Sequence, residues 1–132
     1  MKSATRRLLV YHLPVLLYAG GVIAVSSIRN LPSPRLEGMA IDKMAHFVEY
    51  ALFALLAFRS ATNLGRSIRG ATAALLSLLF VTAFAVLDEY YQRFVPGREP
   101  DAFDIACDSA GALLVLLFLW FRQRRNVRKT AV

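Results

Sequence analysis

Four stretches with few or no charged side chains constrain this chain more than any other feature. Residues 8–27 and 71–87 are runs of 20 and 17 residues without a formal charge, and two further apolar runs cover 42–58 and 104–121. A helix of 20 residues is about 30 Å long, which matches the hydrocarbon core of a bilayer. Lipid admits only helices or closed barrels, and the alternating segments of a barrel are absent from the sequence. We therefore expect an all-α bundle of four transmembrane helices, at about 8–27, 42–58, 71–88 and 104–121.

The composition agrees with a single membrane domain over residues 1–132. The chain is 57% hydrophobic and its mean hydropathy is +0.47. A basic start before an apolar run is also typical of a signal peptide, with a cleavage site near Ala24 and Ser26, but the run is long and further spans follow. We therefore expect an uncleaved first span. The single cysteine, Cys107, excludes an intrachain disulfide and is expected to be a small packing residue.

The lysines and arginines predict the orientation of these spans. Three lie in residues 1–7, three in 59–70 and five in 122–132, against five on the other side of the predicted topology. The positive-inside rule then places both termini in the cytoplasm of a bacterial inner membrane. Because the basic residues follow membrane topology, they account for the net charge of +7, and we do not expect nucleic-acid binding. The same topology puts all nine acids, from Glu37 to Asp108, on or near the outer face.

Two sets of polar residues should therefore meet at the outer face. Each set falls at helical spacing on one side of its helix. Charged side chains are costly in lipid, so we expect both sets to point into the bundle and to contact each other. The second span carries one set and the start of the fourth carries the other: Asp42, His46, Glu49 and Tyr50, and Asp101, Asp104 and Asp108.

Three kinds of chemistry are open to the set on the second span. Histidine with carboxylates can bind a metal ion, a base can be held by an orienting partner, or the groups can lock two helices together. Glu49 is the deepest acid and is a candidate for proton transfer. The candidate catalytic residues are His46, Glu49, Glu89 and Asp104, and the candidate metal ligands are Asp42, His46, Glu49, Asp104 and Asp108.

The segment between the third and fourth spans adds an arginine to this chemistry. Asp88 and Glu89 end the third span, and Gln92 lies on the same helical face as Asp88. A proline and a glycine in 94–97 predict a turn before Arg98. Arg98 is expected either to pair with Asp104 or Asp108 or to bind a phosphate or carboxylate of a ligand. Asp101 and Asp104 also stand where helix-capping residues are common.

Two blocks of the sequence together resemble the VanZ-like family. They are DKMAHFVEYALFALL, residues 42–56, and DEYYQRFVPGREPDAFDIACDSAG, residues 88–111. Where the family usually has an asparagine this chain has Asp108, which adds charge and puts in doubt any role that needs an amide donor. The residues that match the family pattern are Asp42, Lys43, His46, Phe47, Tyr50, Glu89, Gln92, Phe94, Arg98, Asp104, Asp108 and Gly111.

The resemblance implies a small multi-span membrane protein of the cell envelope. The family's namesake is associated with low-level resistance to teicoplanin, a glycopeptide that acts on wall precursors. We expect a binding protein that contacts membrane lipids. Its polar residues at the outer face would bind or shield the headgroup of an envelope lipid or a lipid-linked wall precursor. The expected binding residues are Asp42, Lys43, His46, Tyr50, Glu89, Gln92, Arg98, Asp104 and Asp108.

The alternative is a membrane-embedded enzyme that acts on such a headgroup, with or without a metal. A proton or ion carrier is disfavoured, because no charged group lies in the inner half of any predicted span. The sequence identifies no cofactor, and it leaves homo-oligomer formation open.

Overall fold

The computed structural model describes residues 3–29, 36–65 and 68–130. These residues form helices, and no strand occurs among them. The prediction of an all-α fold is therefore confirmed. The elements are α1 (Ser3–Arg7), the π-helix η1 (Leu8–His12), α2 (Leu13–Ser26), α3 (Leu36–Ala61), α4 (Ala71–Gln92) and α5 (Ala102–Thr130).

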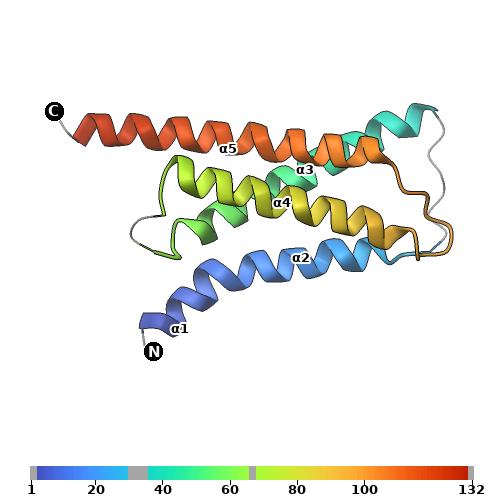
Figure 1. Ribbon diagram of the computed structural model, residues 1–132, viewed down its shortest axis with the longest axis horizontal. Coiled ribbons are helices and arrows are strands. Elements are labelled where there is room, and N and C mark those ends of the chain that lie inside the picture. Colours follow the sequence, from blue (N-terminus) through green and yellow to red (C-terminus); the bar gives the residue numbers. More distant parts are fainter. Residues whose placement is uncertain (1–2, 30–35, 66–67, 131–132) are drawn as a thin grey trace.

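The first three elements continue into one rod, drawn in blue in Figure 1. In η1 the backbone N–H of Leu13 reaches the carbonyl of Leu8, five residues back, which is the π-helical pattern. Pro14 directly follows this π-helical segment as the second residue of α2, and the helix continues through it. The chain can therefore keep a proline near the start of its first apolar run without ending the helix.

The rods lie alongside one another with alternating direction (Figure 1). Helices α3, α4 and α5 pack closely together, and α2 packs mainly against α3. Phe53 is fully buried at the centre, with its ring centroid 5.0 Å from that of Phe84 and 5.6 Å from that of Tyr18. Its aromatic contacts thus join α2, α3 and α4. Both ends of the chain lie at the same end of the bundle (Figure 1).

Among the described residues, three helices are long and apolar enough to cross a membrane: Ala4–Ser26, Ala71–Gln92 and Ala102–Asn126. Large apolar side chains cover their outer faces, such as Leu17 at 67% exposure and Phe118 at 62%. An apolar surface of this kind is typical of a protein in contact with lipid. Helix α3 is 26 residues long but is not among the three, because its first half carries charged residues.

The helices extend beyond the predicted spans. Helix α4 continues to Gln92, and α5 begins at Ala102 and continues into the basic tail. Lys2, Arg35 and Arg66, which contribute to the predicted orientation, lie outside the described residues. The side chains of Glu37, Arg128 and Lys129 lie outside them as well.

Candidate functional site

Polar side chains from four helices gather at the end of the bundle opposite the two termini. They come from the last turn of α2, the first half of α3, the last turns of α4 and the first turns of α5. We call them the polar cluster: Ser26, Asp42, Lys43, His46, Asp88, Glu89, Gln92, Asp101, Asp104 and Asp108.

Lys43 is the central cation of the polar cluster. Its ammonium group donates to Asp101 Oδ2 at 2.7 Å and to Asp104 Oδ1 at 2.5 Å, and it lies 3.7 Å from Asp42 Oδ2. The Lys43 ammonium, helped by the backbone N–H of Phe103, lowers the pKa of the Asp101 carboxyl below its ordinary value. One ammonium thus holds carboxylates of α3 and α5 together.

His46 lies about one helical turn after Lys43 in α3 and faces two buried acids of α5. Its Nδ1 is 3.1 Å from Asp108 Oδ1, and its Nε2 is 3.9 Å from Asp104 Oδ1. Asp104 and Asp108 are 7% and 2% exposed. An imidazole between two carboxylates can hold the helices together or move a proton between the acids. The structure therefore brings His46 of the first predicted set together with Asp104 and Asp108 of the second.

Asp88 joins the end of α2 to the end of α4. Its Oδ2 accepts hydrogen bonds from Ser26 Oγ at 2.7 Å and from Gln92 Nε2 at 3.3 Å. Its Oδ1 is buried without a hydrogen-bond partner among the described residues. Sequence reasoning did not select Ser26, because a serine at the end of an apolar run has no periodic signal, and it did not place Asp88 among the binding residues.

Glu89 and Asp101 together start helix α5. The Glu89 carboxylate accepts a hydrogen bond from the backbone N–H of Asp101, and Asp101 Oδ1 accepts one from the N–H of Phe103 at 2.9 Å. Side-chain oxygens in these positions satisfy backbone donors that have no partner within the helix. The expected capping role therefore applies to Asp101, which also binds Lys43.

Arg98 does not form the expected ion pair with Asp104 or Asp108. Its Nη2 instead donates to the backbone carbonyl of Val25 at 3.0 Å. The last carbonyls of a helix lack intrahelical partners, so the end of α2 attracts a donor, while Lys43 and His46 already contact the two aspartates. The Nε of Arg98 is buried without a partner in the described part of the chain.

Glu49 and Tyr50 have no side-chain hydrogen bond to the acids of the polar cluster in the described part of the chain. Three residues advance a helix by about 300°, so Glu49 is about 60° around the axis from His46 and faces α2. There it lines a groove with Tyr18 and Gly21, and the Tyr18 hydroxyl donates to its backbone carbonyl. Tyr50 is 1% exposed, and its hydroxyl has no partner among the described residues.

A metal ion is compatible with one part of the polar cluster. Asp42, His46 and Asp104 each offer a ligand atom, and these atoms lie within 4.8 Å of one another. Carboxylate oxygens with an imidazole nitrogen suit zinc or other divalent ions. Because the Lys43 ammonium contacts the same carboxylates, a metal ion would have to displace it.

Gly111 sets how closely α5 approaches α3. A Cβ at this position would collide with backbone atoms of Phe47, including its carbonyl oxygen. Small residues are what allow membrane helices to pack backbone against backbone. The two residues belong to the family pattern identified in the sequence, and their contact positions the polar faces of the two helices against each other.

Comparison with known proteins identifies the family. A search of curated proteins and a search of solved structures each found no match. The family model described as VanZ/LLP1 matches residues 4–123, which is nearly the whole chain and includes every residue of the polar cluster. The chain therefore belongs to the VanZ/LLP1 family.

Proposed function

We propose that this VanZ-like protein crosses a bacterial inner membrane four times, with both termini in the cytoplasm. On this proposal the polar cluster lies at the outer surface and binds or shields the headgroup of an envelope lipid or a lipid-linked wall precursor. A shielded precursor is less accessible to teicoplanin, which connects the cluster to glycopeptide tolerance.

The geometry of α3 supports a fourth span. Its 26 residues correspond to about 39 Å, which is long enough to cross the hydrocarbon core. It runs alongside the three apolar helices (Figure 1). Its Lys43 and His46 side chains contact Asp104 and Asp108 of α5. The excess of basic residues at the opposite end of the bundle supports the orientation.

The observation that carries the binding proposal is a group of unpaired polar atoms. The Tyr50 hydroxyl, Asp88 Oδ1 and Arg98 Nε are buried and have no hydrogen-bond partner in the described part of the chain. Buried polar groups are nearly always paired, and an unpaired one costs about 1–3 kcal/mol. All three belong to the half of the bundle that holds the polar cluster, so a polar ligand bound there would pair them.

The charges indicate which headgroups fit. The polar cluster contains six acids and one lysine, and that lysine is already bound to aspartates. Asp88 can accept a hydrogen bond from an amine or hydroxyl, whereas Arg98 can donate to a phosphate or carboxylate. A headgroup with both kinds of group, such as an amino-bearing phospholipid or a wall precursor, meets both requirements.

Replacing Arg98 with alanine should weaken headgroup retention by about tenfold to a hundredfold, because a hydrogen bond to a charged group contributes about 1.5–3 kcal/mol. Native mass spectra of the detergent-purified protein measure the lipid that it retains. Arg93→Ala is the matched control, since Arg93 is exposed and contacts the Tyr90 ring of its own helix. An unchanged lipid profile in Arg98→Ala, with teicoplanin tolerance also unchanged, would contradict the proposal.

A second candidate is an enzyme that acts on the same headgroup. The grouping of Asp42, His46 and Asp104 favours it, because a metal ion held there would polarise a phosphate or ester oxygen. In the same spectra, zinc that is bound by the wild type and lost in His46→Ala would favour this enzyme over a binding protein.

A further inference from the structure

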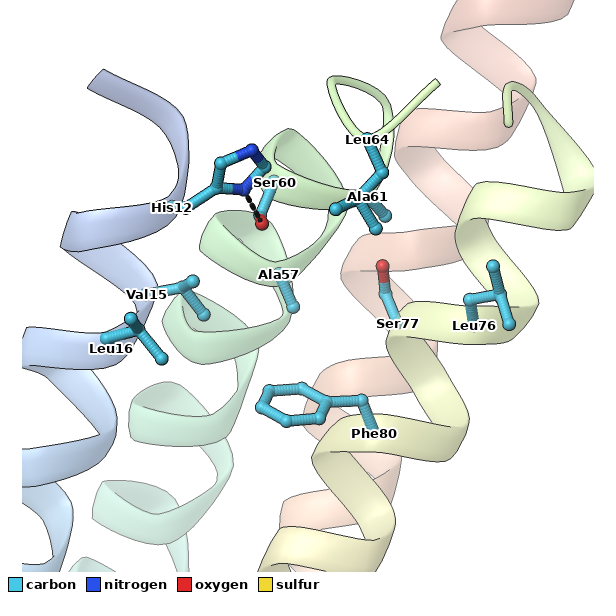
Figure 2. A pocket seen from close by; sticks show the side chains of 10 residues that line it. All are labelled: His12, Val15, Leu16, Ala57, Ser60, Ala61, Leu64, Leu76, Ser77 and Phe80. Carbon is cyan, nitrogen blue, oxygen red and sulfur yellow. Dashed lines mark hydrogen bonds between the residues drawn. The ribbon is translucent and has the colours of Figure 1, made fainter. Parts of the chain in front are cut away.

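A cavity lies at the other end of the bundle, away from the polar cluster. Its volume is about 400 Å³, within the range of small-molecule pockets. Figure 2 shows it between the first rod and α4, with the last turns of α3 behind it. It is partly open to the outside of the bundle, where lipid contacts the helices of a membrane protein.

The walls of this cavity are apolar and its polar groups are few. Val15, Leu16, Leu76 and Phe80 supply aliphatic and aromatic surface. Of the polar groups, the Ser77 hydroxyl is already used, since it donates to the Ala73 carbonyl at 2.7 Å. Such a lining suits a hydrocarbon chain, because hydrocarbon neither needs nor satisfies hydrogen bonds.

The remaining polar groups form one pair at one end of the cavity. His12 Nδ1 and Ser60 Oγ are 2.7 Å apart, and Figure 2 shows them at the end away from Phe80. His12 is the last residue of the π-helix η1, and π-helical segments occur frequently at functional sites. The cavity therefore has a polar end and an apolar body, as a lipid molecule has.

Arginines occur on both helical rods that carry the His12–Ser60 pair. Arg59 precedes Ser60 and lies 5.3 Å from the ring centroid of Tyr11, which is next to His12. Arg6 and Arg7 are exposed in α1, at the same end of the first rod. Basic side chains at a membrane surface attract anionic headgroups.

We propose that this cavity holds one acyl chain of an anionic phospholipid. The chain lies against Val15, Leu16 and Phe80, the ester region contacts the His12–Ser60 pair, and the phosphate is attracted by the arginines beside it. The pair acts in binding rather than in catalysis, because a serine nucleophile needs a base oriented by a third group. No carboxylate bonds to His12 among the described residues, and the polar cluster is at the opposite end of the bundle.

Photocrosslinking in lipid nanodiscs tests this proposal without using the polar cluster. The probe is a phosphatidylglycerol with a diazirine on one acyl chain, compared with a phosphatidylcholine that carries the same chain. Crosslinks from the anionic probe should be concentrated on 76–80 and on Leu16, several-fold above those from the neutral probe. Even labelling of all lipid-facing helices, or equal labelling by both probes, would overturn the proposal.

A variant at the open edge of the cavity provides the control. Leu16 is 60% exposed, so Leu16→Trp can fill the cavity from its edge without unpacking the core. Labelling of 76–80 should then fall several-fold. Leu114→Trp on α5, where the leucine is 61% exposed and does not line the cavity, should leave it unchanged. Equal labelling in the two variants would show that the chain does not occupy this cavity.

Discussion

Gly111→Ala should destabilise the protein by about 3 kcal/mol or more, because the added methyl group collides with backbone rather than with a movable side chain. Helices α3 and α5 must separate at Phe47 to accommodate it. That separation also moves Lys43 and His46 away from the aspartates of α5. Thermal unfolding in detergent, followed by circular dichroism, measures the loss.

Gly20→Ala is the matched control for this substitution. Gly20 also lies inside a helix, but a Cβ there meets no atom within 4 Å. Alanine favours a helix over glycine by up to about 1 kcal/mol, so this variant should be as stable as the wild type or more stable. Equal stability of Gly111→Ala and Gly20→Ala would show that α3 and α5 are not in backbone contact.

Lys43→Met should also be strongly destabilising, by about 3 kcal/mol, because it leaves the buried Asp104 carboxylate without its cation. Asp104, which is 10% exposed at its side chain, loses its closest charged partner. Neutralising that acid in the double variant Lys43→Met with Asp104→Asn should restore much of the loss. Unfolding measurements on the two variants give both values.

Two comparisons make this prediction specific. Arg93→Met removes an exposed cation and should change the free energy of unfolding by no more than about 0.5 kcal/mol. Added zinc should stabilise Lys43→Met more than the wild type if Asp42, His46 and Asp104 can bind a metal ion, because the competing ammonium is gone. A Lys43→Met protein as stable as the wild type would mean that Lys43 does not hold the polar cluster together.

The fold followed from the sequence because lipid leaves a chain few alternatives. Long uncharged runs must become helices, and acids at helical spacing must turn inward. The spacing of Asp101, Asp104 and Asp108 therefore indicated the face of α5 that contacts α3. The same reasoning predicted that His46 of α3 would point into the bundle. It contacts Asp104 and Asp108, which lie on that face of α5.

The contacts that depend on how the helices pack could not be read from the sequence. Ser26 bonds Asp88 only because α2 and α4 end side by side, and Arg98 bonds the Val25 carbonyl because the turn before α5 places Arg98 beside the end of α2. Glu49 satisfies the same periodicity as His46 yet faces α2, since a periodicity gives relative angles and not the position of neighbouring helices. Tertiary packing decides such cases.

The orientation of the polar cluster is the claim on which the proposed function depends most. Single cysteines introduced at Glu99, between α4 and α5, and at Leu64, after α3, test it in a Cys107→Ser background. Both positions are exposed and lie at opposite ends of α4. A membrane-impermeant maleimide applied to the outer side should label Glu99→Cys at once and Leu64→Cys only after permeabilisation. The reverse pattern, or labelling of both from the same side, would contradict the account.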